Sequence, residues 1–492
     1  MSISPLWLSK SGYSIILSII LIQYVNSETL SAQNLDSLIL NSLHFAEEQL
    51  VETVLGFGDS LLYPYHTHPD GSWETNDPGS WVSGWFPGCL WYMYQWTNKD
   101  FWRIQAEKWT QALENSQYKT NSHDVGFIIF CSFGKGYHLT GKDSYKEVIL
   151  TAARSLSTRY HSRVGCIESW NRYLGYSFPV IIDNMMNLEI LFWAAKNGGE
   201  SVWYNMAVSH SLRTMQDHIR EDGSTYQIVA YDTTTGEVIK KLTKQGYDNE
   251  STWARGQAWG MYGFTMAYRE TGDQRFLHTA QRLSDFFITN LPGDFIPNWD
   301  FDFPDTLKDA SAAAIASSAL LELSTLCDDH EDEKKYREAA FDILKSLCSP
   351  LYLAQGTNSS GILMHGIQNC NEEKGIDVSL IYADYYFIET LLRYLDYIDK
   401  YQQVSPSIIL LQNYPNPFNI NTTIWYRLLS DTEISLKVYD LNGRLVQILS
   451  ETFQTTGEYR IPFFSTSLAS GTYFVFLQAG NNLGIRKMTL IH

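Results

Sequence analysis

The chain has 492 residues, a hydrophobic content of 44% and a formal net charge of −18. This length and composition suffice for more than one folded domain and exclude an intrinsically disordered chain. The acidic balance disfavours a nucleic-acid partner, because proteins that bind the phosphate backbone usually carry a basic footprint.

The N-terminus predicts a secretory signal peptide over residues 1–27. Lys10 precedes the apolar run "YSIILSIILIQYV", and Val25 and Ser27 occupy the −3 and −1 positions of a cleavage site. The run is too short for a confident membrane span, and no second apolar run of spanning length follows. We therefore expect an exported mature protein, extracellular or at the cell surface after transit through the periplasm, without a stable membrane span.

From about residue 35 to residue 400, apolar residues recur at three- and four-residue spacing, with Gly, Pro or Asn breaks between the runs. This pattern predicts about twelve helices, and twelve helices make six hairpins. Their starts are expected near residues 36, 84, 100, 125, 143, 183, 201, 253, 273, 308, 333 and 379. If consecutive helices are antiparallel, the even-numbered helices all point the same way, so their N-termini gather at one end of a toroid.

The segments at the starts of the even-numbered helices should therefore surround one pocket. They are rich in Trp, Asp, Arg and Gly. Because helix N-termini carry partial positive charge, this end favours an anionic ligand even in an acidic protein. The six segments are "SGWFPGCLW" (83–91), "SHDVGF" (122–127), "IIDNMMN" (181–187), "TWARGQAWG" (252–260), "KDASAAAIA" (308–316) and "GIDVSLIYADYY" (375–386).

The pattern changes after a short linker over residues 403–407. Alternating stretches such as "TEISLKVYDLNGRLV", with an Asn442-Gly443 turn, and "GTYFVFLQAG" predict a small β-sandwich over residues 408–492. The opening "LLQNYPNPFNINTTIWYRL" and the closing "IRKMTL" resemble the C-terminal sorting domain of type IX secretion, which implies a secretion machinery as partner. The alternative is an ancillary sugar-binding sandwich.

Two acids, Asp124 and Asp183, each stand at the start of an even-numbered helix. Asp is a preferred N-cap residue, so helix capping is one interpretation of both. A pair of carboxyl groups converging on one cleft is also the usual arrangement for acid/base chemistry on a glycoside. The spacing leaves both interpretations open.

Seven motifs occur in order between about residues 35 and 400: "HDVGFIIFCSFGKGYHLTG", "GCIESWN", "IIDNMMNLEILFWAAK", "DGSTYQIV", "KQGYDNESTWARGQAWGMYGF", "DASAAAIASSALLEL" and "GIDVSLIYADYYFIETLLR". Together they resemble glycoside hydrolase family 88, the unsaturated glucuronyl hydrolases. The resemblance implies an all-α (α/α)6 barrel, which we place at residues 28–402. It assigns the two catalytic positions to Asp124 and Asp183.

The family's chemistry implies the substrate and the role of each aspartate. The substrate is an oligosaccharide ending in the 4-deoxy-4,5-unsaturated uronic acid that polysaccharide lyases leave, and its C4=C5 vinyl ether is hydrated. Asp183 would protonate C4 and activate the water that adds at C5. Such a carboxyl must be partly protonated, which burial or the neighbouring Asp124 would favour. The scheme requires no cofactor and no metal, and the six scattered cysteines suggest no zinc site.

Other positions carry over from the resemblance as substrate-binding residues. Gln245 and Arg255 match residues that line the uronate subsite, and the forked donors of Arg255 suit a carboxylate. His123 belongs to the "HDVGF" motif, and Gln227 stands where the family usually has His, which puts the substrate preference in doubt. Four tryptophans are candidates either for stacking walls or for core packing: Trp85, Trp170, Trp253 and Trp259.

Two competing functions remain at this point. The unsaturated rhamnogalacturonyl hydrolases share the barrel and the product chemistry. An exported oligosaccharide-binding protein that has lost turnover would also keep the barrel, and Gln227 is the feature in its favour. The parent polysaccharide, the acceptance of sulfated sugars and the oligomeric state are not specified by the sequence.

Overall fold

The computed structural model describes residues 35–401, 408–441, 444–466, 468–479 and 482–491. The predicted signal peptide, the linker over residues 403–407 and the Asn442-Gly443 turn lie outside the described residues. The described residues divide into two compact units, one of residues 45–397 and one that combines residues 35–44 with the described residues from 398 onward. The domain boundaries predicted above stay a prediction.

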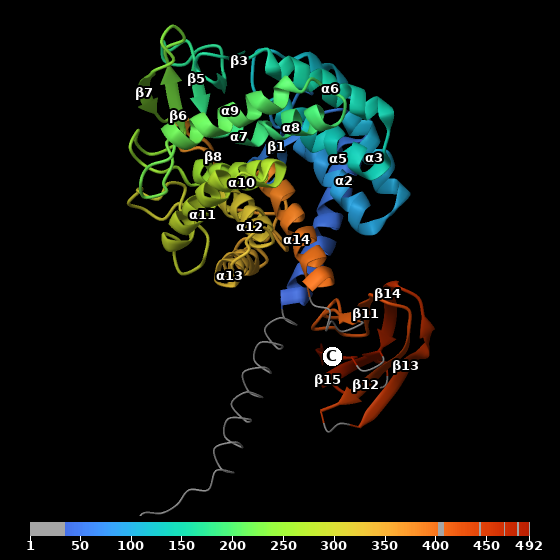
Figure 1. Cartoon of the computed structure of the whole chain (residues 1–492). Helices are drawn as coiled ribbons and strands as arrows, with labels where there is room; N and C mark the ends of the chain where they lie inside the picture. Colours follow the sequence, from blue (N-terminus) through green and yellow to red (C-terminus); the bar gives the residue numbers. More distant parts are fainter. Residues whose placement is uncertain (1–34, 402–407, 442–443, 467, 480–481, 492) are drawn as a thin grey trace, which may run out of the picture. The chain divides into compact units, whose positions relative to one another are not determined.

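The described residues contain twelve helical segments, and each begins within three residues of its predicted start (Figure 1). The segment after α4 passes through a π-helical turn. The segments are a helix over residues 35–57, α2 (Trp85–Thr97), α3 (Asp100–Gln111), α4 (Val125–Ile129) with η2 (Phe130–Gly134) and α5 (Lys135–Thr140), α6 (Asp143–Ser157), α7 (Asn184–Asn187) with α8 (Glu189–Lys196), α9 (Val202–Asp217), α10 (Ala254–Thr271), α11 (Gln274–Thr289), α12 (Ala310–Ser324), α13 (His330–Leu347) and α14 (Ile381–Tyr401).

Alternate helices differ in how they are buried. Every residue of α10 from Ala254 to Ala267 is buried, and α12 is buried almost all round, so both are inner helices. In contrast, α11 buries one stripe that includes Phe276, Ala280, Leu283 and Phe287, as expected of an outer helix with a solvent face. In Figure 1 these helices follow one another side by side. Inner and outer helices therefore alternate, and the six-hairpin barrel is confirmed.

Short strands that the helical pattern did not predict lie in the connections between helices. The three-stranded sheet β5-β6-β7 matters most, because Asp183 follows β5, Gln227 precedes β6 and Gln245 follows β7. These strands and short turns are β1 (Tyr63–Thr67), β2 (Trp73–Asn76), η1 (Glu114–Tyr118), β3 (Tyr160–His161), β4 (Cys166–Ile167), β5 (Pro179–Ile181), β6 (Ile228–Tyr231), β7 (Val238–Leu242), β8 (Gly366–Asn369), η3 (Cys370–Glu372) and β9 (Lys374–Val378).

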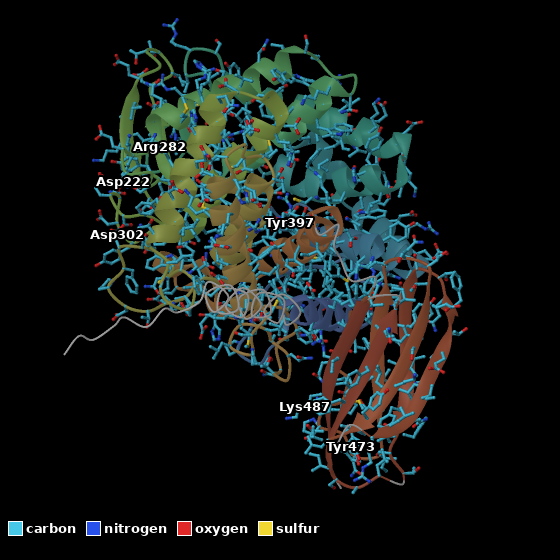
Figure 2. All side chains as sticks on the ribbon, turned by 60° about the horizontal axis from the view of Figure 1, so that its bottom comes forward. Asp222, Arg282, Asp302, Tyr397, Tyr473 and Lys487 are labelled. Atoms are coloured by element: carbon cyan, nitrogen blue, oxygen red, sulfur yellow. The ribbon has the colours of Figure 1, made fainter. Side chains whose placement is uncertain are left out.

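The C-terminal part is the predicted β-sandwich. One sheet has the order β10-β11-β14 and the other β13-β12-β15-β16. Along β11 every second side chain is buried, including Ile424, Tyr426 and Leu428. Figure 2 labels Tyr473 and Lys487 on the paired strands β15 and β16. The strands are β10 (Ile408–Leu410), β11 (Asn421–Leu428), β12 (Thr432–Asp440), β13 (Leu445–Gln454), β14 (Gly457–Phe464), β15 (Gly471–Ala479) and β16 (Asn482–Leu490).

Two further findings concern the whole described chain. None of its described helices combines the length and apolar character that a bilayer crossing needs. All six cysteines lie within the described residues and are free thiols, three of them buried and three partly buried.

Candidate active site

A cavity of about 200 Å³ lies where the inner helices begin. Three of the six predicted segments supply lining residues, those that start α4, α7 and α10. The segments over residues 83–91, 308–316 and 375–386 supply none. The lining residues are Tyr65, Trp81, His123, Asp124, Phe127, Trp170, Ile181, Asp183, Lys244, Gln245, Trp253, Arg255, Trp259, Gln368, Asn369 and Glu372.

A larger cavity of about 770 Å³ is lined by residues of α2, the segment from α4 to α5, α7, α8, α10 and α14. Its buried acid is Glu389, whose carboxylate accepts from Tyr92, Ser318 and Tyr262. Burial alone would raise the pKa of Glu389, but the charges of Arg393 and Lys135 and these hydrogen bonds outweigh it and lower the pKa to about 2. A carboxylate so fully paired is held in its ionised form and suits a structural role, so we place the chemistry in the smaller cavity.

Asp183 lies two residues after the end of β5 and directly before α7. Its side chain makes no capping hydrogen bond, so the capping role expected from its position is wrong. Instead, Oδ2 is buried and has no hydrogen-bond partner in the protein. Burial raises the pKa of Asp183 to about 7; the positive charge of Arg255 opposes this rise and the negative charge of Asp124 adds to it. The pocket therefore contains a carboxyl group that is substantially protonated near neutral pH.

Asp124 stands just before α4, and its side chain also makes no capping bond. The hydroxyl of Ser122 donates to Oδ2, and the Nε2 atom of His123 lies 3.3 Å from Oδ1. Asp124 is therefore held by its own loop with its carboxylate at the pocket wall. The two predicted acids line one pocket, as their positions at helix starts indicated.

His123 is buried, and its neighbours determine which ring nitrogen carries the proton. The Oδ1 atom of Asn187 accepts the backbone N–H of Phe127 at 2.7 Å, so its amide Nδ2 faces Nδ1 of His123 at 3.1 Å. Nδ1 must then accept, which leaves the proton on Nε2, beside Asp124. Burial lowers the pKa of His123 although Asp124 opposes this, so the ring is neutral at neutral pH.

Gln227 does not line the cavity; its amide organises the turn after β7. Its Oε1 accepts from the Thr243 hydroxyl at 2.8 Å and from the backbone N–H groups of Lys244 and Gln245 at 2.7 and 2.8 Å. Its Nε2 donates to Oε1 of Gln245 at 2.9 Å. Gln245 does line the cavity, and its Nε2 donates to the Gln368 carbonyl at 3.0 Å. Gln227, which stands where the family usually has His, therefore supports the pocket wall from behind and does not line the cavity.

Arg255 lines the cavity but is only 1% exposed, and most of its donors are engaged. Nη1 donates to Asp309 Oδ2 at 2.9 Å and to the Ser311 hydroxyl at 3.2 Å. Nη2 donates to the Gln368 carbonyl at 2.7 Å, and the guanidinium carbon lies 4.5 Å from the centroid of the Trp253 ring. The guanidinium group thus ties α10, α12 and β8 together at the pocket wall.

The four predicted tryptophans divide into core and pocket residues. Trp85 is fully buried, packs against Trp81 and Phe127, and does not line the cavity, so it belongs to the core. Trp170, Trp253 and Trp259 line the cavity. The indole N–H of Trp253 is buried without a partner in the protein, which leaves a free donor beside the pocket.

Eight lining residues were not among the predicted site residues, and two of these, Phe127 and Ile181, lie in the predicted segments. Gln368, Asn369 and Glu372 lie on the β8–β9 hairpin. The prediction of the barrel relied on helical periodicity, and a hairpin of short strands does not show it. Lys244, which pairs with Glu372 at 3.5 Å, is adjacent to Gln245 in a quoted motif and could have been found there. The others are Tyr65 on β1 and Trp81 before α2.

Comparisons with known proteins identify relatives of both parts of the chain. The sequence model described as Glycosyl Hydrolase Family 88 matches residues 61–292, and the one described as Secretion system C-terminal sorting domain matches residues 412–491. An unsaturated glucuronyl hydrolase of Formosa agariphila is 42% identical over 322 residues, which cover 64% of this chain and 79% of that protein.

Two further relatives cover more of the barrel. An unsaturated chondroitin disaccharide hydrolase of Streptococcus agalactiae is 30% identical over 381 residues, covering 76% of this chain and 94% of that protein. The crystal structure of an unsaturated glucuronyl hydrolase specific for heparin superposes with a TM-score of 0.71 at 40% identity, covering 74% of this chain and 98% of that one.

Proposed function

The chain belongs to glycoside hydrolase family 88, and from this premise we propose that it removes the 4-deoxy-4,5-unsaturated uronic acid from the non-reducing end of lyase-generated oligosaccharides. The observation that carries the proposal is the Asp183 carboxyl group. It is buried in the pocket, its Oδ2 has no partner in the protein, and its pKa is raised to about 7. A group in this state can donate a proton and take one back at neutral pH.

The proposed reaction is hydration of the C4=C5 vinyl ether. Asp183 donates its proton to C4, and the cation that develops at C5 is stabilised by the ring oxygen. The resulting Asp183 carboxylate accepts a proton from water, whose oxygen bonds to C5 to give a hemiketal. Opening of the hemiketal breaks the C5–O5 bond and leaves a hemiacetal at C1, which expels the remaining sugar as an alcohol.

Other pocket residues bind and orient the substrate in this proposal. The positive charge of Arg255 acts on Asp183, and its remaining N–H groups, with the amide of Gln245, bind the substrate's carboxylate in this proposal. His123 and Asp124 also line the pocket, where the Nε2–H of His123 points to the Asp124 carboxylate and orients it. Trp170, Trp253 and Trp259 provide aromatic surface for sugar rings.

Turnover of unsaturated disaccharides tests the proposal directly. The relatives' names mention heparin and chondroitin disaccharides, so a panel of lyase-generated disaccharides should start with these and include sulfated and unsulfated forms. We expect loss of the ultraviolet absorbance of the C4=C5 bond with at least one member. A folded protein that consumes none of the panel, including rhamnogalacturonan-derived disaccharides, would reject the proposal; consumption of the latter alone would favour the alternative family.

We expect Arg255→Lys to raise KM by about 10-fold and to lower kcat less, because lysine keeps the charge but loses the fork. Arg282→Lys is the matched control. Arg282 also donates to two backbone carbonyls, those of Arg220 and Glu221 at 2.9 and 3.1 Å, but it lies on α11 outside the pocket (Figure 2). An unchanged KM in Arg255→Lys would remove Arg255 from the uronate subsite.

The C-terminal sandwich addresses the protein for export by the type IX secretion system, since residues 412–491 match the sorting domain. We propose that the mature enzyme works outside the cell or at its surface, where lyase products of large polysaccharides arise. The secretion machinery is then the partner of the sandwich, and the oligosaccharide is the partner of the barrel.

We expect a chain shortened to residues 28–402 to keep the kcat and KM of the full chain, because all residues that line the pocket lie between Tyr65 and Glu372. Both proteins are assayed with the same disaccharide after circular dichroism has shown equal helix content. Loss of turnover in a correctly folded shortened chain would contradict the proposal that the barrel alone carries the activity and the sandwich serves export.

A further inference from the structure

Asp309 is completely buried at the start of α12 and does not line the active-site cavity. Its Oδ1 accepts from the backbone N–H of Ser311 at 3.0 Å and from the Ser311 hydroxyl at 2.6 Å, which is an N-cap arrangement. Its Oδ2 accepts from Nη1 of Arg255 at 2.9 Å. Helix capping explains the Ser311 contacts of Oδ1, whereas Oδ2 forms an ion pair with Arg255 on α10.

Asp309 and Arg255 both hydrogen-bond to the backbone of Ile367 in the β8–β9 hairpin. The backbone N–H of Ile367 donates to Oδ1 of Asp309 at 3.4 Å, and the Ile367 carbonyl accepts from Nη1 of Arg255. The next carbonyl, that of Gln368, accepts from Nη2 of Arg255. Gln368 and the two hairpin residues that follow it in the pocket wall, Asn369 and Glu372, are therefore placed by this pair.

The pair also sets the charge beside the reacting acid. Asp309 neutralises Arg255, and Arg255 acts in turn on Asp183. Removing the negative charge of Asp309 would leave Arg255 uncompensated and strengthen its attraction for an ionised Asp183. The other charged and titratable groups that line the cavity with Asp183 are Asp124 and His123 before α4, Tyr65 on β1, Lys244 after β7 and Glu372 on the hairpin. Tyr382 on α14 lies outside the lining and interacts electrostatically with Asp183.

We propose that Asp309 is a positioning residue for the reaction: it holds Arg255 and the β8–β9 hairpin in one arrangement and balances the charge of Arg255 next to Asp183. This inference rests on the proposed function, because the reacting group that it serves is Asp183. It gives Asp309 a role in substrate binding and in the pH profile although it does not touch the cavity.

Asp309→Asn tests the ion pair with Arg255 separately from the helix cap at Ser311. The amide keeps one oxygen for the Ser311 cap but presents an NH2 group to Arg255, where two donors then face each other. We expect kcat/KM to fall by at least about 10-fold, mainly through KM, as the hairpin moves. We also expect the alkaline limb of the pH–rate profile to move to lower pH, by about half a unit or more, because the uncompensated Arg255 favours ionised Asp183.

Asp329→Asn is the matched control. Asp329 caps α13 by accepting from the N–H groups of Glu331 and Asp332, and it lies outside the pocket. Asn caps helices as well as Asp does, so this variant should leave KM and the pH profile unchanged. Ser311→Ala removes one contact of Arg255 and one of Asp309 without changing any charge, and it should raise KM with no shift of the profile.

Hydrogen exchange of residues 366–378 provides a readout that does not need turnover. Exchange in this hairpin should be faster in Asp309→Asn and Ser311→Ala than in the unaltered protein and in Asp329→Asn. Failure of the unaltered enzyme on every disaccharide would reject the proposed function and leave this comparison valid. The positioning role would be overturned if hairpin exchange were unchanged in both variants. It would also be overturned if Asp309→Asn kept the KM and the pH profile of the unaltered enzyme. If Asp309→Asn does not fold, the KM and the hairpin exchange of Ser311→Ala decide whether the positioning role holds.

Discussion

Replacing Asp183 by asparagine is expected to lower kcat by about 100-fold or more, the range that general acid–base groups usually supply. The substitution removes the proton that the proposed mechanism delivers to C4 and keeps the size and shape of the side chain. Because Asp183 makes no capping bond, helix α7 loses nothing by the change. Turnover is followed by the loss of the C4=C5 absorbance under single-substrate conditions.

The chain offers a matched control in Asp384, a second buried aspartate. Burial raises its pKa to about 7 as well, but its carboxylate accepts from the backbone N–H groups of Ile362 and Leu363 at 3.0 and 2.9 Å. Asp384→Asn should lower Tm, because one of these N–H groups loses its acceptor, and should leave kcat within about threefold. If Asp183→Asn remained as active as Asp384→Asn, the proposed mechanism would be wrong.

The raised pKa of Asp183 also fixes the sign of two pH effects. The acid must be protonated to react, so the rate should fall as pH rises through about 7. The folded state holds this proton more tightly than the unfolded state, whose pKa is about 4. The stability that the group contributes is thus complete below about pH 4 and is lost as pH rises to about 7. The Tm of Asp183→Asn relative to the unaltered protein should therefore increase between pH 5 and pH 8.

The helices of the barrel were predictable because apolar residues recur along the sequence at helical spacing. Runs such as "DASAAAIASSALLEL" are apolar on every side and belong to inner helices, whereas α11 carries one apolar stripe, and both patterns were visible in the sequence. In the tail, β11 alternates with a period of two over eight residues, and this pattern is visible in the sequence. The strands β3, β4 and β5 have only two or three residues, too few for any periodicity to show.

The site was predictable in part. Asp124, Asp183 and Arg255 follow from their places at helix starts, where the barrel brings distant segments together. Gln227 was expected to face the sugar, but its amide is used by the turn after β7. That arrangement depends on strand pairing between β6 and β7, which the sequence did not reveal. The β8–β9 hairpin joins the pocket through contacts with Arg255, Asp309, Gln245 and Lys244, each more than 50 residues away in the chain.

Asp124→Asn is expected to lower kcat by about 100-fold as well, and its residual rate should carry a different pH profile. The negative charge of Asp124 adds to the raised pKa of Asp183, so its removal should lower that pKa and move the alkaline limb to lower pH. The amide can still accept from the Ser122 hydroxyl, so the loop should keep its shape. Ser122→Ala is the control for that contact: it removes the hydrogen bond but not the charge, and should cost activity without shifting the limb. An Asp124→Asn enzyme whose residual rate keeps the alkaline limb of the unaltered enzyme would show that Asp124 does not act on its neighbour, and its role would then be confined to holding substrate.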